Sequence, residues 1–267
     1  MTARPETLNP PQTAAGQSLG AMPCYASSCG RVTLYHGESL DILPTLEKVD
    51  AVVTDPPYAT TTESSSLVSR TGPRQTRETQ FFEAWLREQI AAIAGACKPT
   101  AAMWMTLDWR GAMILDTACA KLGIKEPKIG VWDKENCGMG HVLRNSYECF
   151  AVVSMPEWER LTASERDVWN HKWTQGGRES DHAAEKPVPL MAWCLDQAGR
   201  PATVLDPFMG SGSTGVACVQ LGLAFTGIER ERGYFDAACE RIERAQAQGS
   251  LLPLDQTPVA TQQVMEL

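Results

Sequence analysis

Residues 203–214 of this 267-residue chain have the sequence TVLDPFMGSGST. A β-branched run at 203–205 is followed by the acid Asp206, and a loop with Gly210 and Gly212 then leads into a helical pattern. The two glycines allow the backbone to approach a ligand closely, and the first turn of the next helix offers unpaired N–H groups. Strand, Gly-rich turn and helix in this order predict an α/β sheet that binds a ligand beyond the carboxyl ends of its strands.

A second acid ends the next apolar run, FTGIE at 225–229. Glu229 lies 229 − 206 = 23 residues after Asp206, a separation that suits an acid at the tip of the adjacent strand, where a carboxylate binds ribose hydroxyls. The loop matches neither the GxGxxG pattern of dehydrogenases nor the GxxxxGK[ST] pattern of nucleotide triphosphatases. The residues therefore predict a nucleoside site of another kind, with a Gly-rich structural turn as the alternative.

A third feature is Asp55-Pro56-Pro57-Tyr58, directly after the apolar run 51–54. The two prolines restrict the backbone and remove two N–H donors, which fixes the neighbouring carbonyls and the aromatic ring. A carboxylate and a backbone carbonyl together can accept both hydrogens of a planar exocyclic amine, while Tyr58 offers a face on which a heterocycle stacks. The motif predicts a rigid amine-binding site, although an isolated Pro-rich turn with a solvated Asp would have the same sequence.

Strand and helix patterns alternate along most of the chain. Strands are predicted at 31–35, 51–54, 101–106, 128–132, 149–154, 203–205 and 224–228, and helices at 80–97, 111–122, 187–198, 214–221 and 233–247. This alternation predicts the α/β class, with a mostly parallel sheet that is covered by helices on both faces.

Segments without such periodicity set the domain boundaries. Residues 1–30 and 249–267 are predicted as flexible tails, so that 31–248 form one folded domain. Inside it, 59–79 and 155–181 show neither helix nor strand periodicity, and loops of this length within a domain are usually functional or disordered. We expect them to contact the substrate.

The composition excludes some classes of protein. With 24 Lys and Arg against 32 Asp and Glu, the net charge is −8, so any contact with nucleic acid must come from a local basic patch. Apolar stretches such as 90–97 are far shorter than the roughly 20 residues of a membrane span. Without a secretory signal pattern, the chain is expected to be cytoplasmic and to have no membrane partner. The nine cysteines form no CxxC pair, and no metal site is predicted.

Taken together, the motifs resemble the amino-group DNA methyltransferases of the beta class, which use S-adenosylmethionine. In that family a [DNS]PP[YFW] motif precedes the cofactor loop, and a target-reading segment lies between them. The resemblance also includes His36-Gly37-Glu38, Trp132-Asp133-Lys134 followed by Tyr147-Glu148, and the sequence HAAEKP at 182–187. It implies a Rossmann-like methyltransferase fold with a circularly permuted order of motifs and a small inserted target-recognition segment at 155–181.

The resemblance implies a role for each matching residue. Asp55 and the Pro56 carbonyl, in the rigid turn with Pro57, would hold the target amine, and Tyr58 would stack on a flipped base. S-adenosylmethionine, which leaves as S-adenosylhomocysteine, would be bound by Glu38, Lys186, Asp206, Phe208, Gly210, Ser211, Gly212, Thr214 and Glu229. Three positions depart from the family: Glu38 stands where Asp is frequent, and Ala183 and Glu185 stand where Pro and Gln are common.

Double-stranded DNA is the partner that the resemblance implies. An acidic enzyme needs a basic face for phosphate contacts, and the candidates in or near the two loops are Arg70, Arg74, Arg77, Arg144, Lys172 and Arg178. Acidic residues are interleaved among them, so a mixed solvated surface is the alternative. Because 155–181 has only 181 − 155 + 1 = 27 residues, we expect either a short recognition sequence or assembly as a homodimer.

Asp at the first position of the motif is associated mostly with N6-adenine methylation in this family, and the leading prediction is an adenine-N6 DNA methyltransferase. N4-cytosine methylation is the alternative. A protein of another class, a catalytically silent DNA-binding protein, would retain the fold without the intact motif residues, and an enzyme acting on RNA or protein amides fits the order of motifs less well. Methylation at a ring carbon would require a Cys nucleophile, and the single Pro-Cys pair, Pro23-Cys24, lies in the stretch 1–30, apart from the motifs.

Overall fold

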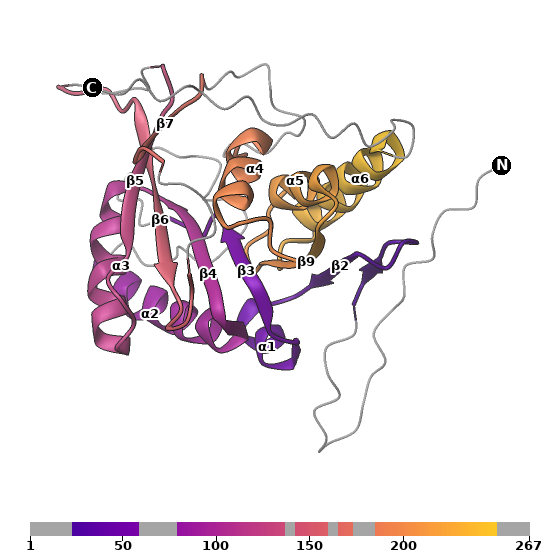
Figure 1. Ribbon diagram of the computed structural model, residues 1–267, viewed down its shortest axis with the longest axis horizontal. Coiled ribbons are helices and arrows are strands. Elements are labelled where there is room, and N and C mark those ends of the chain that lie inside the picture. The colour runs from indigo at the N-terminus through magenta and orange to yellow at the C-terminus, as the bar shows by residue number, and fades with distance from the viewer. Residues whose placement is uncertain (1–22, 59–78, 137–141, 160–164, 173–184, 250–267) are drawn as a thin grey trace.

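A single mixed sheet forms the centre of the structure (Figure 1). The computed structural model describes residues 23–58, 79–136, 142–159, 165–172 and 185–249. Nine strands in these ranges pair in the order β1-β2-β9-β8-β3-β4-β6-β5-β7. Their bounds are β1 Tyr25–Ala26, β2 Val32–His36, β3 Val49–Thr54, β4 Cys97–Leu107, β5 Lys128–Asp133, β6 Tyr147–Ser154, β7 Val168–Asn170, β8 Thr203–Asp206 and β9 Ala224–Glu229.

The strand directions place the residues of the predicted motifs at one edge of the sheet. The pairs β2–β9, β9–β8, β8–β3, β3–β4 and β5–β7 are parallel, whereas β1–β2, β4–β6 and β6–β5 are antiparallel. Every strand except β1 and β6 therefore runs in the same direction. The carboxyl ends of β3, β8 and β9, which carry the predicted motifs, meet at the same edge of the sheet, where ligands of open α/β sheets bind.

Helices cover both faces of this sheet (Figure 1). They are α1 Ser39–Ile42, α2 Thr79–Ala96, α3 Trp109–Leu122, α4 Val188–Gln197, α5 Ser213–Leu221 and α6 Arg232–Gly249, with the 3-10 helix η1 Leu43–Thr45. One apolar core packs α2 and α3 against the sheet, and a second packs α4, α5 and α6. Neighbouring residues of β3 alternate between them: Val52 belongs to the first core and Val53 to the second. This alternation is the period of two that a strand imposes on its side chains.

The predicted α/β class, with helices on both faces, is confirmed, and the predicted strands and helices lie within a few residues of the observed ones. The prediction of a flexible tail at 1–30 was wrong at β1, a strand that lies inside this stretch. Its two residues pair with Leu34 and Thr33, and Tyr25 packs against the second core. The predicted strands also omit β7, which lies inside 155–181 and adds to the sheet through β5. At the other end of the domain, α6 continues to Gly249.

Other parts of the predicted tails and loops, residues 1–22, 59–78, 160–164, 173–184 and 250–267, lie outside the described residues. None of the described helices combines the length and hydrophobicity needed to cross a membrane.

Candidate active site

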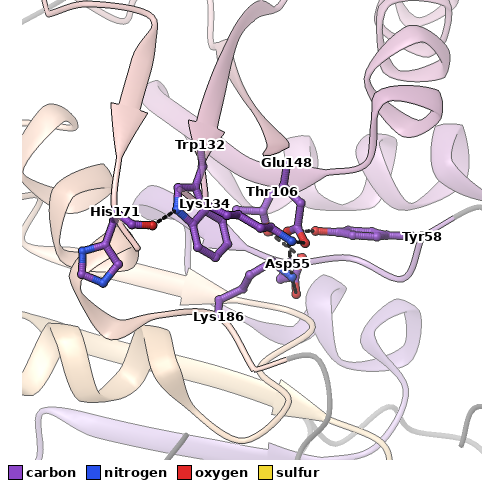
Figure 2. Close-up of polar contacts among 8 residues, drawn as sticks. All are labelled: Asp55, Tyr58, Thr106, Trp132, Lys134, Glu148, His171 and Lys186. Carbon is purple, nitrogen blue, oxygen red and sulfur yellow. Dashed lines mark hydrogen bonds and ion pairs between the residues drawn. The ribbon is translucent and has the colours of Figure 1, made fainter. Parts of the chain in front are cut away.

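Asp55 lies directly after β3, at the carboxyl edge of the sheet, and both of its oxygens are engaged (Figure 2). Thr106, on β4, donates its hydroxyl hydrogen to Oδ1 of Asp55 at 2.5 Å. Lys186, in the segment before α4, donates to Oδ2 at 2.6 Å. Two donors from different elements therefore fix the orientation of the carboxylate, and each oxygen keeps acceptor capacity for another hydrogen.

Tyr58 is held by the same group of residues. Its hydroxyl donates to Oε2 of Glu148 at 2.9 Å, and the Lys186 ammonium lies 4.9 Å from the centre of its ring. Burial, Asp55 and Glu148 together raise the pKa of Tyr58 well above its usual value, so the phenol remains a hydrogen-bond donor at neutral pH. Between Asp55 and Tyr58, Pro56 is buried and Pro57 is exposed.

Glu148 and Lys134 complete a cluster of four charges with Asp55 and Lys186, which we call the charge cluster (Figure 2). Lys134 forms an ion pair with Oε1 of Glu148, and Lys186 lies 3.4 Å from Oε2. Burial alone would raise the pKa of Glu148, but Lys186 and Lys134 outweigh it and lower the pKa to about 2. Burial likewise disfavours the Lys186 ammonium, yet Asp55 and Glu148 leave its pKa raised. The cluster thus joins two lysines and two carboxylates from separate elements.

Sequence reasoning assigned no role to Thr106, Lys134 or Glu148. The last two were part of the family resemblance, and their position gives a further signal: Lys134 follows β5 directly, and Glu148 is an acid near the start of an otherwise apolar strand, β6. A charged residue in a strand that pairs on both sides needs a partner, because an unpaired buried charge is costly.

Asp206, at the end of β8, connects the predicted cofactor half to this site. Its Oδ1 accepts hydrogen bonds from the hydroxyl of Thr54 at 2.6 Å and from the N–H of Phe208 at 3.1 Å. Thr54 is the residue before Asp55, so one hydrogen bond joins the tips of β3 and β8. Burial raises the pKa of Asp206 to about 7, against the opposing effect of hydrogen bonds from Thr54 and Thr214.

The raised pKa of Asp206 should make the free energy of unfolding depend on pH. In the unfolded chain this carboxyl loses its proton near pH 4, whereas in the folded protein it keeps it to about pH 7. The folded state binds more protons in this window, so this group lowers the free energy of unfolding by up to about 1.4 kcal/mol per pH unit as the pH rises through it. We expect Asp206→Asn, which preserves the acceptor for Thr54, to gain stability relative to the parent between pH 5 and 7. Urea unfolding at several pH values measures this, and a pH-independent difference would contradict it.

The Gly-rich loop is held by Glu229 on one side and by α6 on the other. The N–H of Gly210 donates to Oε2 of Glu229 at 2.8 Å, and the N–H of Glu231 donates to Oε1 at 2.8 Å. Burial raises the pKa of Glu229. Gly212 has φ +87°, and a Cβ there would lie 3.0 Å from the Cβ of Ala238 on α6. A Cβ on Gly210, with φ +54°, would meet no atom within 4 Å. There is thus no room for a side chain at Gly212, whereas the space beside Gly210 is unoccupied by other residues that the structure describes.

Matched substitutions at these two glycines separate backbone strain from crowding. Both require positive φ, which disfavours Ala at either position. Only Gly212→Ala also presses on α6, and overpacking adds about 1–3 kcal/mol. We therefore expect Gly212→Ala to lower the free energy of unfolding more than Gly210→Ala does, as measured by urea unfolding. Equal losses would show that the contact with α6 is relaxed without cost.

The remaining predicted cofactor residues lie near this loop, with one exception. Ser211 and Thr214 are buried, and the ring of Phe208 packs against Trp85 at 5.9 Å.

Glu38 is exposed, at 60%, and lies 3.4 Å from Arg230. The pairing of His36 with Glu229 places Glu38 at the same edge of the sheet. Lys186 is the exception: its ammonium contacts the carboxylates of the charge cluster.

Of the predicted DNA contacts, Arg144 and Lys172 are described and both are exposed. Arg144 precedes β6 and Lys172 follows β7, and Asp133 pairs with both Tyr147 and Asn170. The two basic residues therefore lie at the same edge as Asp55. Arg70, Arg74, Arg77 and Arg178 lie outside the described residues.

In the part of the chain that the structure describes, no group of three His, Cys, Asp or Glu side chains is placed to bind a metal ion.

Comparisons with known proteins agree with this geometry. Residues 49–240 match the family model of the N6/N4 DNA methylases. The type II methyltransferase M.HinfI of Haemophilus influenzae is 25% identical over 250 residues, which cover 79% of this chain and 68% of the relative.

Two solved structures share the fold. The complex of M1.HpyAVI with SAM has a TM-score of 0.57 at 24% identity and covers 79% of this chain and 99% of that one. The cytosine-N4-specific PvuII DNA methyltransferase has a TM-score of 0.68 at 15% identity, over 86% of this chain and 95% of that one. The family match spans both the Asp55 motif and the Gly-rich loop, so this chain belongs to the N6/N4 family of DNA methylases.

Proposed function

We propose that this protein transfers the methyl group of S-adenosylmethionine to the exocyclic N6 amine of adenine in double-stranded DNA. The observation that carries the proposal is the hydrogen bond from Thr54 to Asp206. It joins the strand that presents Asp55 to the strand that leads into the Gly-rich loop. An amine acceptor and a nucleoside-binding loop thus lie side by side, as a direct transfer between two bound molecules requires.

The residues of the loop fit S-adenosylmethionine. Glu229 is a buried acid at the tip of β9, suited to ribose hydroxyls, and its hydrogen bonds with the backbone fix its orientation. The open space at Gly210 allows a ligand to approach the backbone, and the helix α5 begins directly after Gly212. When bound there, S-adenosylmethionine supplies a methyl group on a positively charged sulfur.

Asp55 is the residue that prepares the amine. Its carboxylate and the Pro56 carbonyl accept the two amine hydrogens, which directs the nitrogen lone pair toward the methyl carbon. As the new N–C bond forms, the C–S bond breaks with its electron pair on sulfur, and the amine releases one proton toward Asp55 and water. Lys186 stays an ammonium because of its raised pKa, so it orients Asp55 and is not the base. No covalent enzyme intermediate is needed.

DNA must present a base outside its stack, since an amine within the duplex cannot reach this site. Extrusion costs a few kcal/mol, which stacking on Tyr58 and hydrogen bonds to Asp55 offset. The exposed Arg144 and Lys172 lie at this edge and are suited to phosphate contacts. Their contribution should fall as the salt concentration rises.

N4 of cytosine is the second candidate target, because it is also an exocyclic amine and the fold is shared with the cytosine-N4-specific PvuII enzyme. Adenine is favoured by the family tendency associated with Asp at position 55. Incubation with unmethylated bacterial genomic DNA and labelled S-adenosylmethionine, followed by nucleoside chromatography, distinguishes the two. We expect N6-methyladenine, whereas N4-methylcytosine would overturn the choice of base and retain the choice of reaction.

A further inference from the structure

Arg241, on α6, is a buried cation that the reaction described above does not use. Its Nη1 donates to the backbone carbonyl of Ser211 at 2.7 Å and to the Ser211 hydroxyl at 3.1 Å. Its Nη2 donates to Oε1 of Glu185 at 2.7 Å. The side chains of Arg241 and Glu185 are 3% and 5% exposed. One guanidinium thus joins α6, the Gly-rich loop and the segment that precedes α4.

The segments that Arg241 joins serve different halves of the reaction. Ser211 lies between the two glycines of the loop that fits the cofactor. Glu185 is followed directly by Lys186, whose ammonium orients Asp55 and lies over the Tyr58 ring. The bonded path therefore runs from the loop through Arg241 and Glu185 to the residue that holds the amine acceptor.

Packing alone does not require a charge at this position. The other buried residues of α6 are apolar, namely Phe235, Ala238, Ile242 and Ala245. A buried ion pair is often no more stable than apolar side chains of similar size, so such a pair is weak evidence for a role in stability. The planar guanidinium instead holds several acceptors in fixed relative positions. It also provides a buried partner for the Glu185 carboxylate.

We propose that Arg241 and Glu185 are positioning residues that hold the cofactor loop and Lys186 in register. The Arg241–Ser211 contacts set the loop for S-adenosylmethionine, and the Arg241–Glu185 contact places Lys186 against Asp55. Arg241 therefore affects both cofactor binding and methyl transfer, whereas Glu185 affects mainly transfer. This inference rests on the proposed function and adds to it a link between the two halves of the site.

The test uses Arg241→Met, Glu185→Leu and the double variant, which replaces the ion pair by an apolar pair. Calorimetry gives the affinity for S-adenosylmethionine, single-turnover methylation of DNA at saturating cofactor gives the transfer rate, and urea unfolding gives stability. We expect Arg241→Met to lose about tenfold in both affinity and rate. Glu185→Leu should lose about tenfold in rate while its affinity stays within about twofold.

The double variant separates positioning from stability. We expect its urea midpoint to recover toward that of the parent, because no unpaired charge is left buried, while its affinity and rate stay low. Recovery of affinity and rate together with the midpoint would overturn the proposal, as would losses in all variants that simply follow their midpoints. The matched control is Arg232→Met/Asp236→Leu, an exposed pair on the same helix, which should leave affinity and rate unchanged.

Failure of the proposed function gives a different result. A parent protein that binds S-adenosylmethionine but methylates no DNA would refute the function. The affinities of Arg241→Met and the double variant would then still test the inference, because calorimetry needs no DNA. Unchanged affinity in both would overturn it.

Discussion

Asp55→Asn is expected to lower the rate of methyl transfer about 10²–10³-fold, comparable to the loss of one preorganised polar group in other active sites. The substitution replaces one acceptor oxygen by an NH₂ donor at a point where Thr106 and Lys186 already donate. One of these donors loses its acceptor, and less acceptor capacity remains for the target amine. The affinity for S-adenosylmethionine should change by less than about twofold, because this variant retains the cofactor loop. Single-turnover methylation and calorimetry measure the two quantities.

Asp50→Asn is the matched control for this experiment. Asp50 lies on the same strand, at its opposite end, and is likewise paired with a lysine, Lys98, at 2.7 Å. Replacing the Asp50 carboxylate should lower the free energy of unfolding and leave the transfer rate unchanged. A transfer rate for Asp55→Asn within tenfold of that of the parent would contradict the assigned role of Asp55.

Lys186→Met should have the second largest effect, on both stability and rate. Removing the ammonium leaves Asp55 and Glu148 close together with Lys134 as their remaining cation in the charge cluster. Breaking a buried pair costs about 3–5 kcal/mol. Because the Asp55 side chain is 25% exposed and Glu148 is 18% exposed, we expect about 2–3 kcal/mol in the free energy of unfolding, measured with urea. The transfer rate should fall about 10²-fold, as Asp55 is no longer held in place.

Two further variants test this explanation. Lys186→Met/Glu148→Gln removes one of the two carboxylates and should regain part of the lost stability without regaining the rate. Lys98→Met breaks the lysine–aspartate pair at the other end of β3, where Lys98 is 42% exposed, and should have little effect on either quantity. If Lys186→Met retains the parent's transfer rate, Lys186 does not orient Asp55.

The strands and helices could be predicted closely because each has a pattern of its own. The run 51–54 is apolar on both faces, as expected for a strand buried between two helical layers, and helices such as α3 begin and end at clear signals, Asp108 and Gly123. β1 and β7 could not be predicted in this way. They have two and three residues, too few to show alternation, and they exist because β2 and β5 offer edges with which to pair.

Trp169 illustrates how tertiary contacts decide between interpretations. A tryptophan in the predicted target-recognition segment 155–181 can either contact a base or join a hydrophobic cluster. In the structure it belongs to β7 and lies 6.3 Å from the ring of Trp132 and 6.1 Å from that of Trp193. These contacts support the hydrophobic cluster.

The candidate site was predictable only where a motif is continuous in sequence. Asp55 to Tyr58 and the Gly-rich loop are local, and their chemistry follows from residue type and order. The charge cluster joins residues from separate parts of the chain: Lys186 meets Asp55 131 positions away, and Glu148 meets Tyr58 90 positions away. Sequence alone did not show that Lys186 would contact Asp55. Only the strand order, which brings β3, β4 and β6 side by side, makes these contacts visible.

The most direct test of the central claim is transfer of a labelled methyl group from S-adenosylmethionine to mixed-sequence duplex DNA by the full chain. We expect label on an exocyclic amine of a base in the digested DNA, with none detected for Asp55→Ala. Cofactor binding without label in DNA, label on a ring carbon, or equal transfer by Asp55→Ala would contradict it.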